Sequence, residues 1–271
     1  MKIHTLTYIT SIILAFTTLL LVAKTINHNY VITNAANAEH SLTTNQLSVI
    51  ASDNVYNSQD EVVKPKKVVY LTFDDGPSIH TKKLLNILDK YGVKATFFVV
   101  GNNGSYSWIK KAANQGHTIG LHSYSHRYEE IYSSKSAYLK DLAAIQDVVY
   151  ESTGKKTSII RFPGGSSNLI SASIKKGIMT ELAKTVTDQG YHYFDWNVDS
   201  GDGSGHLTRQ QIAHNVIEGI KCHDTSIVLQ HDIWLESIYA VEDIIKWGLA
   251  NGYSFAPLTT DSFNAHHKIN N

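Results

Sequence analysis

Two adjacent carboxylates, Asp74 and Asp75, are the first residues in this chain whose types and spacing could do chemistry. They end a β-branched and aromatic run and precede a Gly-Pro turn, in residues 68–78 (Val-Val-Tyr-Leu-Thr-Phe-Asp-Asp-Gly-Pro-Ser), which is typical of a strand that stops at a site. Two ionised carboxylates this close repel each other unless a cation, an arginine or a shared proton lies beside them. Asp before Gly-Pro is also common for backbone reasons alone, so the function of the pair depends on its partners.

His122 and His126 are candidate partners. They lie four residues apart in His-Ser-Tyr-Ser-His, a spacing that on a helical turn brings both rings to one face. Two imidazoles and one carboxylate form a recurrent ligand set for a divalent metal that keeps a position open for water or substrate. Surface histidines share this spacing, so the inference requires Asp75 to lie at the same place.

The elements that would position these residues alternate between short β-rich runs and longer amphipathic runs, which predicts βαβ units and a parallel sheet. Strands are expected near residues 68–73, 95–100, 117–121, 158–162, 192–197, 226–230 and 254–258, and helices near 80–91, 105–115, 134–153, 171–189, 208–221 and 235–250. About seven parallel strands with intervening helices predict a distorted (β/α) barrel. The alternative, an open doubly wound sheet, would want a glycine-rich phosphate loop after its first strand, where this chain has carboxylates that repel phosphate.

Chemistry in such barrels gathers at the carboxyl ends of the strands. Titratable or metal-binding groups follow five of the predicted strands: Asp74 with Asp75, His122 with His126, Arg161, Asp199 and His231. Singly, each has an ordinary structural explanation, such as a salt bridge at the rim, a turn residue before glycine or a helix cap. Together they predict one site at one end of the barrel.

Five ordered segments resemble the motifs of the polysaccharide deacetylases, the family of NodB-like carbohydrate esterases. The resemblance covers about residues 67–258 and lies in Thr72-Phe-Asp-Asp-Gly-Pro77, His122-Ser-Tyr-Ser-His126, Arg161-Phe-Pro-Gly-Gly165, Asp199-Ser-Gly-Asp202 and Leu229-Gln-His231. It implies that the metal ligands are Asp75, His122 and His126, with Zn²⁺ the usual ion and other divalent metals serving in relatives. Such a metal would polarise the acetyl carbonyl and lower the pKa of its water.

The resemblance also implies roles for the remaining groups. Asp74 would be the general base, kept ionised by the metal and by Arg161. His231 would be the general acid that protonates the leaving amine, with its pKa raised and its ring held by Asp199. Backbone N–H groups of the loop 163–165, together with the metal, would bind the tetrahedral oxyanion.

The chain departs from the family pattern at two positions. Gly203 stands where the fourth motif usually has a tryptophan after its second acid, and Gly164 stands where the third motif usually has an aromatic residue. Both positions help to wall the sugar groove in relatives, so these changes affect substrate specificity rather than the metal chemistry. We expect Trp196 or Trp234 to supply the missing aromatic face.

Composition restricts the partners. Lys+Arg and Asp+Glu each number 24, so the formal net charge is zero and nucleic acid is not an expected partner. The chain has one cysteine, Cys222, which excludes an intramolecular disulfide and a thiolate metal cluster. An uncharged polymer fits better, since 15 Tyr and 4 Trp offer flat faces for sugars.

The chain is expected to divide into four segments. Residues 1–38 predict a signal peptide or signal anchor, because residues 9–23 form an uncharged apolar run and Ala36-Asn37-Ala38 fits a cleavage site. A polar spacer follows at 39–66, then a catalytic domain at 67–260 and a tail at 261–271. The enzyme would then be secreted, or tethered to the outer face of the cell membrane and associated with the wall.

The expected function is metal-dependent hydrolysis of acetamido groups on an N-acetylglucosamine polymer, giving acetate and a free amine. Peptidoglycan is the first choice, because an export signal and a short spacer would keep a lone catalytic domain close to the wall. Poly-N-acetylglucosamine, chitin oligomers and O-acetylated xylan follow. The rivals are a wall-binding module with a decayed site and an esterase that uses the same metal site.

Overall fold

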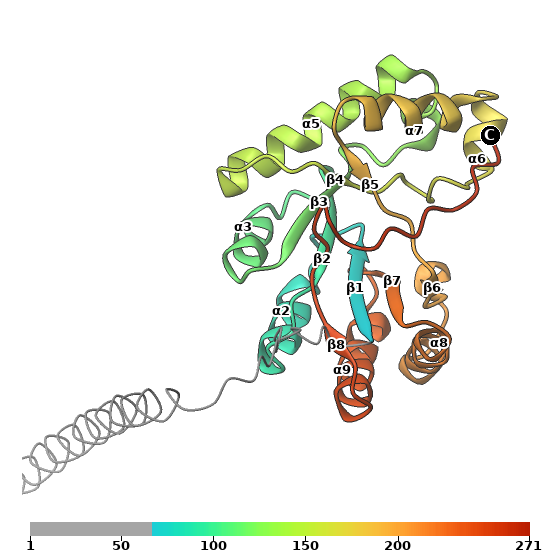
Figure 1. Ribbon diagram of the computed structural model, residues 1–271. Coiled ribbons are helices and arrows are strands. Elements are labelled where there is room, and N and C mark those ends of the chain that lie inside the picture. Colours follow the sequence, from blue (N-terminus) through green and yellow to red (C-terminus); the bar gives the residue numbers. More distant parts are fainter. Residues whose placement is uncertain (1–66) are drawn as a thin grey trace, which may run out of the picture. The chain divides into compact units, whose positions relative to one another are not determined.

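A curled sheet of parallel strands forms the centre of the molecule (Figure 1). The computed structural model describes residues 67–271. The strand order is β5-β4-β3-β2-β1-β7-β6, and an eighth strand, β8, pairs with the start of β1. The strands are β1 (Val68–Asp74), β2 (Thr96–Val100), β3 (Thr118–Ser123), β4 (Ile159–Ile160), β5 (His192–Tyr193), β6 (Val198–Asp199), β7 (Thr225–His231) and β8 (Ser254–Phe255). Seven strands form a half-barrel along this path, which confirms the predicted distorted (β/α) barrel.

Helices connect the strands and cover the outer face of the sheet (Figure 1). They are α2 (Thr81–Lys90), α3 (Ser107–Asn114), α4 (Tyr128–Ile131), α5 (Lys135–Thr153), α6 (Ile170–Ile174), α7 (Ile178–Asp188), α8 (Arg209–Lys221) and α9 (Leu235–Ala250), with a 3₁₀ turn at Asp202–Ser204. The helix expected over 171–189 is two helices, because Gly177 interrupts it at a φ of 82° that favours glycine. No helix between residues 67 and 271 is long and apolar enough to cross a membrane.

The strand expected over 192–197 is also divided. Its first part, β5, pairs with β4, whereas β6 pairs with β7 at the other end of the sheet. Asn197 marks the change of partner, since its side chain donates to the Thr225 carbonyl (2.9 Å) and accepts from the Ile227 N–H (2.7 Å). Residues 194–197 therefore cross the side of the half-barrel where β5 and β6 leave it open.

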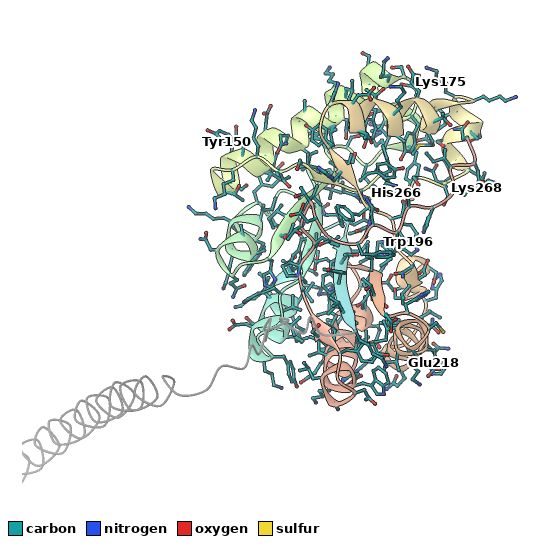
Figure 2. All side chains as sticks on the ribbon, viewed as in Figure 1. Tyr150, Lys175, Trp196, Glu218, His266 and Lys268 are labelled. Atoms are coloured by element: carbon teal, nitrogen blue, oxygen red, sulfur yellow. The ribbon has the colours of Figure 1, made fainter. Side chains whose placement is uncertain are left out.

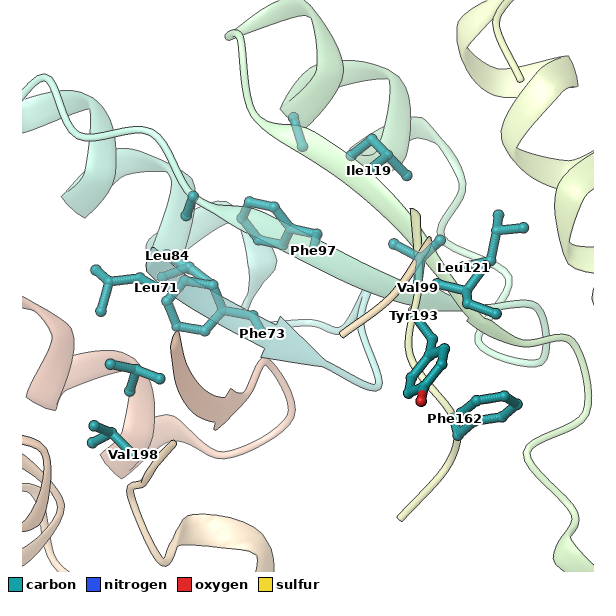
Figure 3. Close-up of a cluster of buried hydrophobic side chains, with 14 of the residues drawn as sticks. Leu71, Phe73, Leu84, Phe97, Val99, Ile119, Leu121, Phe162, Tyr193 and Val198 are labelled. Atoms are coloured by element: carbon teal, nitrogen blue, oxygen red, sulfur yellow. The ribbon is translucent and has the colours of Figure 1, made fainter. Parts of the chain in front are cut away.

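Apolar side chains fill both faces of the sheet. Phe97 belongs to the larger cluster between sheet and helices, which also contains Phe73 and Val99 (Figure 3). The adjacent residue Phe98 points to the opposite, concave face, as the alternation of a strand requires. There it forms a smaller cluster with Ile159, Phe194, Ile227 and Leu258. Burial on both faces is typical of parallel strands, and it makes the barrel rim a rigid support for a site.

Residues 261–271, expected to be a tail, lie against the domain. Ile269 packs against the larger apolar cluster, and the Thr180 N–H donates to the Asn271 carbonyl (2.8 Å). Residues 67–271 belong to one compact unit. The expected signal segment, residues 1–38, and the polar spacer, residues 39–66, lie outside the described residues.

Candidate active site

Six of the seven residues expected at the site meet at one end of the barrel. The register of β1 against β7 places Asp74 beside His231, and β3 ends near them with His122. A hollow of about 220 Å³ opens there, and the residues that line it are Asp74, Asp75, His122, His126, Tyr128, Gly164, Trp196, Gly203, Leu229 and His231. Arg161 is fully buried directly behind Asp74. Asp199, the seventh expected residue, does not line this hollow.

Asp75, His122 and His126 point one ligand atom each at a common centre, with the three atoms within 4.8 Å of one another. The Asp75 Oδ1 atom lies 3.5 Å from His122 Nε2 and 3.2 Å from His126 Nε2. This oxygen is buried and has no hydrogen-bond partner among the described residues. Burying an unpaired carboxylate oxygen is costly, so the donor set fits a divalent cation with nitrogen and oxygen ligands.

The two histidines do not share a helical turn, contrary to the expectation from their spacing. His122 lies within β3 and His126 in the loop that follows. The loop curls back because His126 adopts a φ of 54°, and Asp75 likewise has a φ of 68°. Such backbone is rare for residues other than glycine and persists where the surroundings enforce it, commonly at functional sites.

Hydrogen bonds fix the tautomer of His122 and the course of the loop. His122 Nδ1 donates to the Arg161 carbonyl (2.8 Å), which leaves the Nε2 lone pair facing the centre. Burial lowers the pKa of His122 to about 3, so the ring is neutral, as a metal ligand must be. Asp141 on α5 accepts from Ser123 Oγ (2.6 Å) and from the N–H groups of Tyr124 (2.8 Å) and Ser125 (2.9 Å). No sequence signal marks Asp141, because it lies in the middle of an ordinary amphipathic helix.

Asp74 lies beside the three candidate metal ligands, Asp75, His122 and His126, and pairs with Arg161. Arg161 Nη1 donates to Asp74 Oδ1 (2.8 Å) and Thr72 Oγ1 (2.7 Å), while its Nε and Nη2 donate to the carbonyls of Phe194 (2.9 Å) and Asp195 (3.0 Å). Burial raises the pKa of Asp74, and the charge of Arg161 opposes this rise. A carboxylate kept ionised but more basic than usual suits a general base.

His231 pairs with Asp202, so the prediction that Asp199 holds this ring is wrong. Asp202 is buried, and its two oxygens accept from His231 Nδ1 (2.7 Å) and from the His231 N–H (2.7 Å). Asp199 is exposed, and its Oδ1 accepts from the Gly201 N–H (2.8 Å). Burial alone would lower the pKa of His231, but the hydrogen bond and charge of Asp202 raise it to about 9.

Asp232 fixes the Gly-Pro turn that follows Asp75. Its carboxylate is buried and accepts from Thr81 Oγ1 (2.6 Å), and its carbonyl accepts from Ser78 Oγ (2.6 Å). A Cβ on Gly76 would overlap the Asp232 carboxylate. The close approach of the Asp232 side chain therefore requires glycine at position 76, where the Gly-Pro sequence already predicts a turn.

The loop 163–165 offers one free backbone donor. Pro163 has no N–H, and the Gly165 N–H donates to the Phe162 carbonyl (2.8 Å). The Gly164 N–H donates to no acceptor within residues 67–271, and Gly164 lines the hollow. This N–H is the donor that could face an oxyanion.

The two glycines at unusual positions differ in their surroundings. Gly164 has a φ of 75°, and a Cβ there would lie 2.9 Å from the Tyr128 hydroxyl, so a larger residue does not fit this loop. Gly203 is open, since a Cβ would meet only the His231 ring at 3.4 Å. Of the two expected aromatic faces, Trp196 lines the hollow, whereas Trp234 packs over Gly205.

Comparison with known proteins identifies the class of enzyme. The sequence profile described as polysaccharide deacetylase matches residues 61–180. A peptidoglycan-N-acetylglucosamine deacetylase of Bacillus cereus is 32% identical over 214 residues, covering 76% of this chain and 74% of that protein. This chain belongs to the polysaccharide deacetylase family, hydrolases of carbon–nitrogen bonds other than peptide bonds. The predicted resemblance to this family is thereby confirmed.

Individual relatives differ in the sugar for which they are named. The catalytic domain of peptidoglycan N-acetylglucosamine deacetylase from Eubacterium rectale superposes with a TM-score of 0.75 at 47% identity, covering 83% of this chain and 100% of that one. The peptidoglycan-N-acetylmuramic acid deacetylase PdaC of Bacillus subtilis is 30% identical over 206 residues, covering 74% of this chain and 40% of that protein. The family assignment thus leaves the acetylated sugar open.

Proposed function

We propose that this enzyme is a metal-dependent N-deacetylase that acts on N-acetylglucosamine residues of peptidoglycan. The observation that carries the proposal is the geometry around Asp75. Asp75, His122 and His126 form a candidate metal triad, and the buried carboxylate of Asp74 lies beside it. His231, an imidazole that favours its protonated form, lines the same hollow. This arrangement provides a base and an acid around one hollow that can hold the reacting carbon.

A divalent metal at Asp75, His122 and His126, with Zn²⁺ the first choice, would polarise the acetyl carbonyl and lower the pKa of the attacking water. Asp74 accepts the proton of that water as its oxygen attacks the acetamido carbon. The Gly164 N–H donates to the oxygen that becomes negative in the tetrahedral intermediate. His231 gives its proton to the nitrogen as the carbon–nitrogen bond breaks, which leaves acetate and a free amine.

The pKa values of the two groups support these directions of proton transfer. Burial makes Asp74 more basic than an exposed carboxylate, and Asp202 keeps His231 protonated through neutral pH, with a pKa of about 9. Arg161 keeps Asp74 ionised and oriented by donating at 2.8 Å. Hydrolysis of this bond needs a base that takes a proton from water and an acid that gives a proton to the nitrogen. Two groups whose surroundings favour an ionised carboxylate and a protonated imidazole suit these roles.

The choice of sugar and polymer rests on the relatives. The Eubacterium rectale protein, at 47% identity, and the Bacillus cereus protein, at 32%, are both named for N-acetylglucosamine of peptidoglycan. Poly-N-acetylglucosamine, chitin oligomers and O-acetylated xylan are the other candidates. Because peptidoglycan lies outside the cytoplasm, we also propose that the enzyme acts there, after export directed by the expected N-terminal signal, either secreted or tethered to the membrane.

The test is release of acetate by the purified protein with added zinc. The substrates are peptidoglycan, N-acetylglucosamine oligomers and an O-acetylated xylan, and the variants are Asp74→Asn and His126→Ala. We expect release from the first two substrates, abolished by both substitutions and by chelation of the metal. Release from the O-acetylated polymer alone would contradict the proposal in favour of an esterase, and binding of peptidoglycan without release would favour a wall-binding module.

A further inference from the structure

The C-terminal segment crosses the open side of the half-barrel. Residues 264–271, here called the C-terminal strap, run in dark red across the sheet toward α6 (Figure 1). Asn264 Nδ2 and His266 Nε2 both donate to the Tyr193 carbonyl, each at 3.0 Å. The His266 ring also stacks on Tyr193 with centroids 3.9 Å apart. The strap therefore covers the edge of β5 that pairs with no other strand within residues 67–271.

His267 connects the strap to two segments of the active site. Its N–H donates to Asp195 Oδ2 (2.9 Å), and its Nε2 donates to the Trp196 carbonyl (2.6 Å). Its Nδ1 then accepts from Ser167 Oγ (3.1 Å). Figure 2 shows the strap passing close to Trp196, which lines the catalytic hollow. One residue of the strap thus contacts both the crossing segment 194–197 and the loop after Gly165.

Asp195 is the buried group at this junction. Its carboxylate is fully buried and accepts from the Ser166 N–H (2.8 Å), from Ser166 Oγ (2.5 Å) and from the His267 N–H (2.9 Å). Its carbonyl accepts from Arg161 Nη2 (3.0 Å). A carboxylate removed from water requires such donors in fixed places, so Asp195 fixes Ser166 against the strap.

The position of Ser166 matters because two glycines precede it. Gly164 and Gly165 have φ values of 75° and 76°, and glycines adopt many other conformations at little cost. The loop is tied at Gly165 by the hydrogen bond to Phe162 and at Ser166 by Asp195. The free N–H of Gly164 shares a planar peptide unit with the Pro163 carbonyl, which accepts from the buried Tyr132 hydroxyl (2.7 Å). Its direction therefore depends on that bond together with the ties at Gly165 and Ser166.

We propose that the C-terminal strap, acting through His267 and Asp195, aligns the Gly164 N–H as the oxyanion donor. Asp195 is a positioning residue in this scheme, since it contacts the loop and not the reacting atoms. The inference rests on the proposed deacetylase function. Removing one oxyanion donor lowers kcat by roughly 100- to 1,000-fold in other hydrolases, and misaligning it should cost about tenfold or more.

The test compares two altered residues with a matched control from the same strap. Asp195→Asn places an NH₂ group against one of the N–H donors. His267→Ala removes the side-chain bonds to Trp196 and Ser167 and leaves the backbone N–H that donates to Asp195. His266→Ala is the control, because that side chain contacts Tyr193 and not the loop. We expect the first two variants to lose kcat by about tenfold or more, with metal content and the pH limits of kcat unchanged, and the control to keep its kcat. KM should stay unchanged in Asp195→Asn, whereas His267→Ala also loosens Trp196 and can raise KM.

A second measurement does not depend on activity. ¹⁵N relaxation of the Gly164 and Gly165 amides should show greater mobility in Asp195→Asn and His267→Ala than in the wild type and in His266→Ala. Unchanged amide mobility, unchanged kcat, or an equal fall of kcat in the His266→Ala control would overturn the proposal. If the wild type releases no acetate, the proposed function fails, and the amide relaxation still decides whether the strap orders the loop.

Discussion

Replacing Asp202 with asparagine should narrow the pH range in which the enzyme works. The two oxygens of Asp202 each accept from His231, one from the backbone N–H and one from Nδ1, both at 2.7 Å. Asparagine offers one oxygen and one NH₂ group, so it can serve only one of these donors. When its oxygen keeps the backbone N–H, its NH₂ faces Nδ1 and disfavours the protonated ring.

The size of the effect follows from the pKa of His231. Burial lowers this pKa, and Asp202 more than offsets burial and raises it to about 9. Without the carboxylate the pKa should fall toward the ordinary value of 6.5, which corresponds to roughly 3 kcal/mol. The acid must be protonated, so activity is lost above its pKa. The alkaline limb of kcat should therefore move down by about two pH units, and kcat at pH 8 should fall about ten- to thirtyfold.

The assay is kcat for acetate release from an N-acetylglucosamine oligomer between about pH 5.5 and about pH 10, in Asp202→Asn, Asp199→Asn and the wild type. Asp199 is exposed and accepts from the Gly201 N–H, so its variant should keep the wild-type profile. An alkaline limb that stays in place in Asp202→Asn, or that moves instead in Asp199→Asn, would refute the reasoning about which carboxylate serves His231.

Four further substitutions, one of them a matched control, test other parts of the site. His126→Ala should weaken zinc binding, measured by calorimetry, by more than about a hundredfold, because loss of an outer partner alone costs 10- to 100-fold; unchanged affinity would place the metal elsewhere. Gly164→Ala should lower kcat about tenfold or more, because it should shift the N–H proposed to bind the oxyanion. The new Cβ would lie 2.9 Å from the Tyr128 hydroxyl, and the φ of 75° at this position disfavours alanine. The matched Gly203→Ala, with open space, should keep at least half of the wild-type kcat, and equal losses in both would contradict this distinction. Trp196→Ala should raise KM for oligosaccharides several-fold through lost stacking, and an unchanged KM would remove Trp196 from the groove.

Sequence patterns predicted the fold and most of the site because both follow strand periodicity. Parallel strands with buried faces read as apolar runs, and their carboxyl ends gather at one rim. Asp74, Asp75, His122 and His231 therefore came together as expected. The partner of His231 could not be read in this way, because Ser200 and Gly201 turn the chain and bring Asp202, not Asp199, beneath the ring.

The C-terminal strap was missed for a different reason. Its contacts are mostly hydrogen bonds from polar side chains to backbone carbonyls, as in the bonds of Asn264 and His266 to Tyr193. Such contacts leave no hydrophobic period in the sequence, so residues 261–271 resemble a solvated tail. The division of the strand expected over 192–197 was hidden as well, because its aromatic run continues through the point where Asn197 changes partners.

The central place of β1 has a consequence for the order in which the site can form during synthesis. Asp75, His122 and His126 lie at or just after the carboxyl ends of β1 and β3, which with β2 make up the first strands of the domain to leave the ribosome. His231 arrives with β7, near the end of the domain, and pairs with β1 across a long sequence separation. Contacts of this kind form late. The candidate metal ligands can therefore assemble before the proposed acid is in place, and the proposed hydrolysis must wait until the C-terminal half of the domain has folded onto β1.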